Sequence, residues 1–420
     1  MNFKRIIFML TSIILALTIL FNLCSCQDRI YAQDLTKDIK ISSAVGKQAD
    51  DRFINSQLKL CAELFKSVIS GNESNNVLIS PLSVQLALSM TANGADGETK
   101  AEMERLLGSN IPTDELNKYL YNYVNSFLSD DKSKLKSANS IWFKDGNTLS
   151  IKEEFLKTAK SYYDVSVFKA DFDKKTVKSI NNWVDKNTDG MIDHIVDDIS
   201  PYAVMYIINT LIFNAEWETV YQEYNVSDGT FNSISGNNQT VSMMHSTEGI
   251  YLEDENATGF VKYYKDCKYG FAALLPNKDI SIYEYIDTLS AESLSEILEN
   301  AQDEAVTAAI PKFSYEYSLT MNDMLCELGM QSAFDVNKAD FSKLATSSNG
   351  NICIGKVLHK TYISVNELGT KAGAATIVEM DCGSSMPPKK TVTLDRPFLF
   401  MITDTSTNLP VFIGMIVEIG

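Results

Sequence analysis

One stretch, residues 367–386, most constrains what this chain can fold into, because it has the composition of a loop and the alternation of a β-strand. Successive side chains of a strand point to opposite faces of a sheet. Here one face is small at its start and apolar further on, and the other face carries every charge. The first face comprises Thr370, Ala372, Ala374, Thr376, Val378 and Met380, and the second comprises Lys371, Gly373, Ala375, Ile377, Glu379 and Asp381. The segment could therefore join a crowded sheet as an extra strand, and a bulky residue near its start would prevent this.

The same stretch resembles the proximal hinge and reactive-centre loop of the serpins, whose inhibitory members carry Glu-x-Gly-Thr followed by a run of Ala, Gly and Thr. A flexible Ala/Gly linker would share this composition, so the rest of the sequence has to decide. Lys371 departs from the pattern, because the family usually has an acid there. The resemblance implies a hinge that consists of Glu367, Gly369, Thr370, Lys371, Ala372, Gly373, Ala374, Ala375 and Thr376.

Other segments that resemble serpin sequence occur in the family's order from Phe53 to the C-terminus. Residues 76–90 read as a short strand that runs into a helix, with Ser80 at the cap and Pro81 in the first turn. Residues 204–217 are apolar over most of their length, which is typical of a strand buried on both faces. This ordered agreement favours the serpin interpretation over a linker.

The predicted architecture is a single domain over residues 52–420, with its reactive-centre loop at residues 367–390. No linker or repeat divides the chain, and a hydrophobic fraction of 45% allows a substantial core. The resemblance implies the α+β serpin fold, with a large mixed central sheet able to accept an extra strand. Further β-sheets and about eight to nine helices are expected around it.

The resemblance also assigns roles to residues outside the loop. It implies a hydrogen-bonded cluster where the central sheet opens, formed by Ser80, Ser83, Asn209 and His359. It places Trp217 near the point where the loop first enters the sheet, together with an ion pair between Lys312 and Glu367. A partly exposed pair of this kind is worth less than about 1 kcal/mol.

The N-terminus has the pattern of an export signal. Two basic residues precede the apolar run 6–23, which ends in a sequence resembling a bacterial lipobox with Cys26 as the lipidated residue. We therefore predict a lipoprotein-type signal peptide over residues 1–25, followed by a flexible tether over residues 26–51. The expected location is the extracellular face of the bacterial cell membrane, or the medium if the protein is secreted. An uncleaved transmembrane anchor is the alternative, because the apolar run is nearly long enough to span a bilayer.

The chain is acidic, with a formal net charge of −17. Such a surface repels nucleic acid and anionic lipid headgroups. Some serpins are activated by heparin through a basic helix, but the comparable region here, residues 114–131, is acidic. We therefore expect no nucleic-acid partner and no heparin activation, and we expect a monomer.

The sequence contains no motif for an enzyme's chemistry. It has no nucleophile elbow, no paired histidines of a metalloprotease and no phosphate-binding glycine loop. Asp185, Asn187 and Asp189 have the opening spacing of a calcium loop, but Val196 stands where a bidentate Glu is needed. The cysteines show neither metal nor disulfide spacing. We predict no cofactor, no metal and mostly buried free thiols.

The resemblance implies an inhibitor that acts as a suicide substrate. A target serine protease attacks the loop and forms an acyl-enzyme. The cleaved loop then inserts into the central sheet, and the protease, carried along in a covalent 1:1 complex, is distorted so that deacylation stalls.

The reactive bond follows from the family spacing, counted from Gly369. This spacing puts the bond between Gly383 and Ser384, and a register one residue shorter puts it between Cys382 and Gly383. A longer register approaches Ser385 and Met386. Neither bond follows Lys or Arg, so we expect elastase-like or subtilisin-like targets. The alternative function is that of a non-inhibitory serpin-fold binding protein at the cell surface, for which bulky or charged hinge residues would be expected.

Overall fold

A computed structural model of the protein describes residues 30–40, 43–70, 74–127, 133–146, 149–200, 203–348, 350–370 and 388–419. The predicted signal peptide, the lipidation residue Cys26 and residues 371–387 of the reactive-centre loop lie outside the described residues. Among the helices of the described segments, none is both long enough and apolar enough to cross a membrane.

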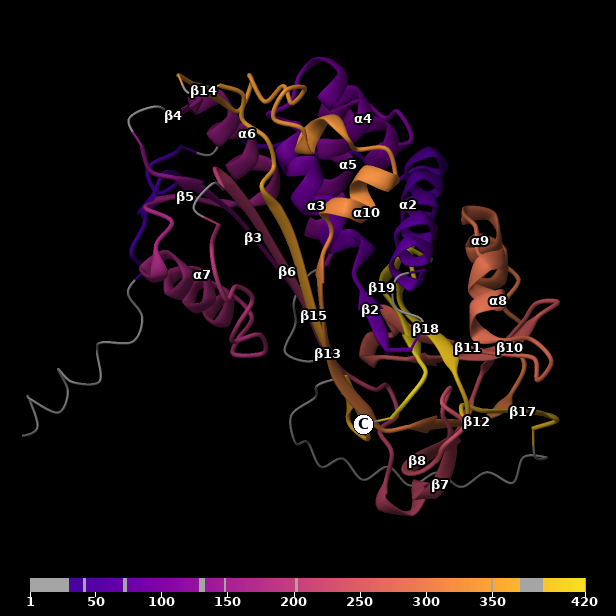
Figure 1. Ribbon diagram of the computed structural model, residues 1–420. Coiled ribbons are helices and arrows are strands. Elements are labelled where there is room, and N and C mark those ends of the chain that lie inside the picture. Colours follow the sequence, from indigo (N-terminus) through magenta and orange to yellow (C-terminus); the bar gives the residue numbers. More distant parts are fainter. Residues whose placement is uncertain are drawn as a thin grey trace, which may run out of the picture.

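The fold is organised around one large mixed sheet, sheet A, which runs beside the helices (Figure 1). The pairs β3–β5 and β6–β15 are parallel, and the other strand pairs of sheet A are antiparallel. In spatial order its strands are β1 (Gln33–Asp34), β5 (Ser166–Ala170), β3 (Ser133–Lys144), β6 (Met205–Glu216), β16 (Gly369–Thr370), β15 (Lys356–Asn366) and β13 (Phe313–Thr320).

Both faces of the middle of sheet A are buried, which explains the long apolar run of β6. On one face lies the main core, which includes α3 (Pro81–Ala92), a helix whose residues are all buried. On the other face, α7 (Lys174–Asn187) contributes to a second core, in which Trp183 lies with Ile208 and Leu358. A strand in this position has no solvent-facing side, so its sequence does not alternate between apolar and polar residues.

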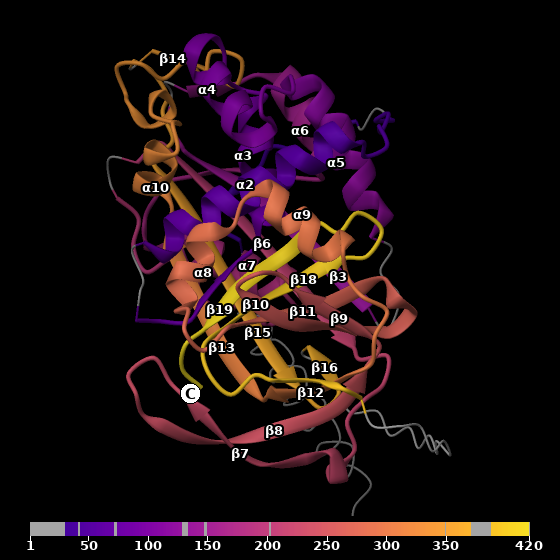
Figure 2. The same cartoon turned by 90° about the vertical axis from the view of Figure 1, so that its right-hand side faces the viewer.

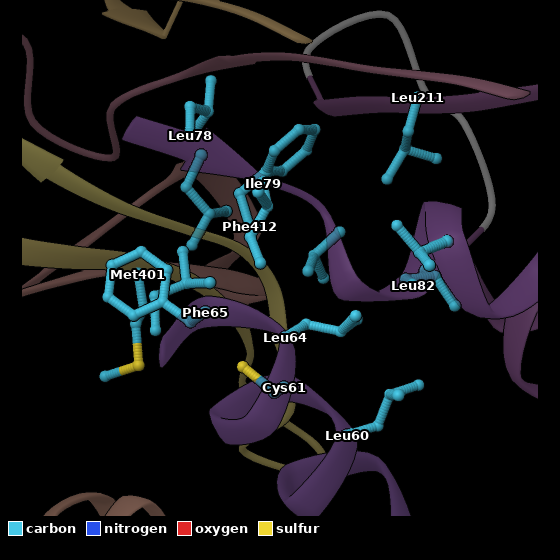
Figure 3. Packing of buried hydrophobic residues seen from close by; sticks show 14 of the residues in the cluster. Leu60, Cys61, Leu64, Phe65, Leu78, Ile79, Leu82, Leu211, Met401 and Phe412 are labelled. Atoms are coloured by element: carbon cyan, nitrogen blue, oxygen red, sulfur yellow. The ribbon is translucent and has the colours of Figure 1, made fainter. Parts of the chain in front are cut away.

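The remaining helices cover the main core. α2 (Asp51–Ile69) begins after Asp50, whose side chain accepts a hydrogen bond from the Phe53 N–H. Figure 3 shows side chains of α2 packed beside those of Leu78, Ile79 and Phe412. The other helices are α4 (Gly97–Gly108), α5 (Thr113–Ser126), α6 (Glu153–Tyr163), α8 (Ile282–Thr288), α9 (Ala291–Glu299) and α10 (Asn322–Glu327).

Two further sheets complete the core, and a two-stranded pair joins β4 (Leu149–Ile151) to β14 (Ala345–Ser347). Sheet B contains, in spatial order, β2 (Val77–Ile79), β19 (Pro410–Ile416), β18 (Phe398–Asp404), β11 (Tyr269–Pro276), β10 (Ala257–Tyr263) and β9 (Ile250–Glu253). Sheet C contains, in spatial order, β17 (Lys390–Thr393), β12 (Val306–Pro311), β8 (Asn238–Glu248) and β7 (Val226–Asn232). Sheet C lies at the end of the molecule opposite α4 and β14 (Figure 2).

The segment before α2 differs from the flexible tether expected over residues 26–51. From Ile30 onward its described residues lie against the domain, and β1 adds an edge strand to sheet A by pairing with β5. Closer to α2, the ammonium of Lys47 lies 2.6 Å from the carboxylate of Glu115. The sequence did not indicate this packing, because the apolar residues that contact the cores are irregularly spaced and backbone pairing leaves no pattern in the side chains. These residues are Ile30, Ala32, Leu35, Ile39 and Ala49.

We expect Gly414→Ala to destabilise the protein by about 1–3 kcal/mol, because the site in β19 has no room for a side chain. A Cβ at this position would lie 2.5 Å from the ring of Phe400 and 2.9 Å from the carbonyl oxygen of Val77. Gly249→Ala is the matched control, since a Cβ there would meet nothing within 4 Å. Denaturant unfolding of both variants measures the difference, and equal stability of the two would contradict the packing described for sheet B.

Candidate functional site

The candidate site is a split in sheet A between the parallel strands β6 and β15. The two strands pair directly only at one end, where residues 356–359 of β15 lie opposite residues 206–209 of β6. At the other end β16 lies between them and pairs with both. Between these two regions, residues 210–214 of β6 do not pair with residues 360–364 of β15, and no strand of the described residues lies between them. The middle of the sheet is therefore parted while both of its ends are closed.

Gly369 makes the first step of this inserted strand possible. Its backbone has φ of 151°, in the positive region that favours glycine. A Cβ here would lie 2.0 Å from the carbonyl oxygen of Ala215 and 2.8 Å from Cα of Glu216. Any side chain at position 369 would therefore push β16 away from β6.

Trp217 fixes the turn that precedes β16. Its indole N–H donates to the carbonyl of Asn366 at 2.8 Å, and its backbone N–H donates to the carbonyl of Leu368 at 2.9 Å. The indole stacks on the ring of Tyr264, with centroids 4.4 Å apart. The hydroxyl of Tyr264 lies 2.6 Å from Oγ1 of Thr370, so the buried Thr370 side chain faces the main core with its polar atom partnered.

The ion pair expected between Lys312 and Glu367 is present, and about a third of each side chain is exposed. Burial alone would raise the pKa of the Glu367 carboxyl, but the hydrogen bond from Lys312 and its positive charge outweigh this and hold the pKa below its ordinary value. The pair anchors the start of the loop to the end of β12, just before β16 enters the sheet.

The predicted cluster of four residues is present in part. The Ser80 N–H donates to Nε2 of His359 at 3.1 Å, and Oγ of Ser80 accepts from the Ser83 N–H at 3.2 Å. Asn209 lies opposite His359 in the strand register, but its amide donates to Oδ1 of Asn139 on β3. Oγ of Ser83 and Oδ1 of Asn209 have no hydrogen-bond partner among the described residues. Near the paired end of β6 and β15, these two polar atoms are therefore buried without a partner, which costs roughly 1–3 kcal/mol each.

His359 is neutral in this cluster. Because Nε2 accepts the hydrogen bond from Ser80, the ring proton must be on Nδ1. Burial in the interior lowers the pKa of His359 to about 4, since a charged ring would lose its hydration without gaining a partner. Protonation would also abolish the acceptor that Ser80 uses.

A second connection crosses the split on its outer face. After α7, Asp189 accepts from Lys134 at 2.6 Å and from Lys136 at 3.0 Å, both on β3. Further along the same segment, the carbonyl of His194 accepts from Lys360 of β15 at 2.8 Å. The segment from residue 188 to residue 200 therefore ties β3 to β15 across the opening, and we call it the outer strap.

Sequence reasoning identified some of these residues and missed others. Lys371, the run from Ala372 to Thr376 and the reactive-bond candidates at residues 382–384 lie outside the described residues. Asn139, Lys360 and Tyr264 were not predicted. β3 contains several other polar residues, so nothing in the sequence marked Asn139, and nothing distinguished Lys360 from a surface lysine.

Comparisons with known proteins agree with this geometry. The family model described as "Serpin (serine protease inhibitor)" matches residues 55–419. An uncharacterized serpin-like protein of Thermococcus kodakarensis is 34% identical over 363 residues, which cover 84% of this chain and 82% of that protein. The crystal structure of the thermophilic serpin tengpin in its native state has 49% identity and a TM-score of 0.89, covering 93% of this chain and 100% of that chain.

Tengpin in its latent state has a similar identity, 47%, but a lower TM-score of 0.80, with 90% of this chain and 100% of that chain covered. The described residues are thus closer to the native form. The central sheet of this chain is mixed, it is parted between two parallel strands, and the hinge begins a new strand between them. The chain belongs to the serpin family, and the predicted α+β serpin fold is confirmed.

We expect the stability of the protein to fall as the pH is lowered from 6.5 to 4, in part through His359. The unfolded chain binds a proton on this residue near pH 6.5, whereas the folded state resists it until about pH 4. The unfolded state therefore holds more protons in this window, and the loss is of the order of 3 kcal/mol. His359→Gln should flatten this part of the pH profile, as measured by urea unfolding at each pH. His245→Gln, at an exposed histidine, is the control, and an equal flattening by both changes would contradict the role of burial.

Proposed function

We propose that this protein is an inhibitor of serine proteases that acts as a suicide substrate. In this proposal the protease cleaves the loop after residue 370, remains attached as an acyl-enzyme, and is immobilised as the loop inserts between β6 and β15. Elastase-like or subtilisin-like enzymes are the proposed targets. The observation that carries the proposal is β16, which already forms the first two pairs of the additional strand.

The register of β16 supports continued insertion. Thr370 lies opposite Ala215 on β6 and opposite Val365 on β15. Continuing both antiparallel ladders residue by residue brings Thr376 opposite Asn209 on one side and opposite His359 on the other. These two residues already lie opposite each other in the β6–β15 ladder. Two separate registers therefore agree on one strand path, which is what an inserted strand requires.

The same register shows what insertion has to overcome. Residues 371–375 of the new strand would fill the part of sheet A that is already open. From Thr376 onward, the strand must separate residues 356–359 from residues 206–209, and widening the sheet must also stretch the outer strap. Each residue ordered costs on the order of 1–2 kcal/mol, and the new ladder hydrogen bonds and the burial of Val378 and Met380 oppose this cost.

A gel experiment tests the proposal. The protein is mixed with neutrophil elastase, subtilisin and trypsin, and the products are separated under denaturing conditions. We expect a complex that survives denaturation with the first or second enzyme, and mass spectrometry of the released C-terminal peptide identifies the cleaved bond. Cleavage by every enzyme without any complex would favour the non-inhibitory alternative.

Thr370→Arg is expected to turn the inhibitor into a substrate. Thr370 is 2% exposed and its hydroxyl meets Tyr264, so a long cation would be buried there without a partner. Thr370→Ser is the matched control, because it keeps the hydroxyl and adds no bulk. The fraction of protease trapped per loop cleaved measures the effect. Trapping by the Arg variant at the level of the Ser variant would argue against insertion.

We also propose that the protein is held at the outer surface of the cell by a lipid on Cys26. The lipobox-like sequence supports this location. Cys26→Ser should move the protein from the detergent phase to the aqueous phase in Triton X-114 partitioning, with Cys61→Ser as a control at a buried cysteine. Retention of the Cys26 variant in the detergent phase would contradict lipidation and favour the transmembrane anchor.

A further inference from the structure

The chain before α2 meets the domain at one edge of sheet A. There β1 pairs with β5, and the Tyr31 N–H donates to Oγ of Ser179 on α7 at 2.7 Å. Ile30 packs against the second core. In Figure 1, β5 and α7 lie on the opposite side of the molecule from α8 and α9. We call the surface formed by β1 and the first two turns of α7, residues 30–34 and 174–180, the N-terminal edge.

The link between this edge and the proposed lipid is short. Three residues separate Cys26 from Ile30. A fully extended chain spans at most about 3.6 Å per residue, so the Cα atoms of these two residues lie within about 14 Å of each other. A lipidated cysteine lies at the level of the headgroups, because its acyl chains enter the hydrocarbon. The N-terminal edge therefore has to lie next to the bilayer, whereas a flexible tether over residues 26–51 would have let the domain turn freely.

The exposed side chains of the N-terminal edge suit the headgroup region of a bilayer. Lys174, Lys175 and Lys178 are exposed, and none of them forms an ion pair within the part of the chain that the structure describes. Tyr31 is 49% exposed, and the ammonium of Lys175 lies 5.9 Å from the centre of its ring. Lysines near a bilayer are attracted to anionic headgroups, and tyrosine is enriched at the interface between membrane and water.

The net charge of −17 is unevenly distributed over the molecule. Residues 278–304, which include α8 and α9, contain eight acids and one lysine. Residues 30–40 and 169–178, which include β1 and the start of α7, contain six lysines and four acids. Repulsion by anionic lipid therefore acts mainly on the side of α8 and α9, and it favours the orientation in which the N-terminal edge faces the bilayer. The outer strap carries four exposed aspartates, which confine the contact to the first two turns of α7.

Contact at this edge leaves the hinge accessible. Through β5, Gln33 of β1 is level with Phe143 of β3. Through β6, Thr370 of the hinge is level with Ser133 of β3. The two levels are ten residues apart along β3, which corresponds to about 33 Å.

We propose that the N-terminal edge docks on a lipid bilayer that contains anionic lipid, and that the short link to Cys26 holds it there with the hinge end of sheet A clear of the contact. This inference rests on the proposed lipid anchor, and it adds the orientation of the domain on the membrane. The anchored molecule presents its reactive-centre loop to proteases in one fixed orientation.

Amine labelling tests the orientation. The lipidated full chain is bound to vesicles of phosphatidylcholine with phosphatidylglycerol, and acylation of each lysine by an N-hydroxysuccinimide ester is followed by mass spectrometry. The control chain carries a flexible Gly/Ser insertion of about 20 residues between Gln27 and Asp28. We expect the three lysines of the N-terminal edge to react at least about threefold more slowly in the chain of natural length than in the control. Lys278, exposed just before α8, should react equally in both chains, and equal rates at the three lysines would overturn the proposal.

Two charge reversals test the role of the lysines. Lys178→Glu and Lys278→Glu change the net charge equally at exposed positions, but only Lys178 belongs to the N-terminal edge. On the same vesicles, Lys178→Glu should speed the acylation of Lys175 about twofold or more relative to its rate in detergent, and Lys278→Glu should leave it unchanged. Equal effects of the two changes would overturn the contact with anionic lipid.

The outcomes separate this inference from the proposed anchor. The mass of the N-terminal peptide and the Triton X-114 partitioning report whether Cys26 carries a lipid. If it does not, the anchor proposal fails and the docking falls with it. If the lipid is present and the insertion changes no labelling rate, the anchor stands but the docking proposal is overturned. Protease trapping is measured separately and does not depend on either result.

Discussion

The short parallel ladder between β6 and β15 is the constraint on which the rest of the structure depends. Residues 356–359 hold residues 206–209 at one end of sheet A, and β16 occupies the other end. The strands between these ends are parted, although both faces of the sheet are covered by packed cores. In the proposed function this parted region is where one more strand enters, and the hinge already supplies the first two residues of that strand.

Some buried polar groups around the ladder have no hydrogen-bond partner among the described residues. His359 is kept neutral by burial, and the side-chain oxygens of Ser83 and Asn209 have no partner among the described residues. Native proteins rarely leave buried polar atoms unpaired. We interpret these atoms, together with the outer strap, as features of a state that is held in place rather than fully relaxed.

Much of the fold and of the candidate site could be predicted from the sequence, because the residues that match the family pattern each have a specific structural role. Gly369 is required by its positive φ, and Trp217 and Lys312 contact the hinge at the expected place. The misses have a different origin. Asn139 and the outer strap depend on which strands lie side by side, and β1 is held by backbone pairing, which leaves no pattern in the side chains. Lys262 is buried and its ammonium lies 2.9 Å from the carboxylate of Glu248, although both residues look like ordinary surface charges in the sequence.

The central claim is that the parted middle of sheet A accepts the loop once the loop is cut. The most direct test is amide hydrogen exchange of residues 210–214 and 360–364, measured before and after limited cleavage within residues 371–387. If the loop inserts, both segments become strongly protected in the cleaved protein, and its melting temperature rises well above that of the intact protein. Unchanged exchange in both segments, with an unchanged melting temperature, would contradict the account.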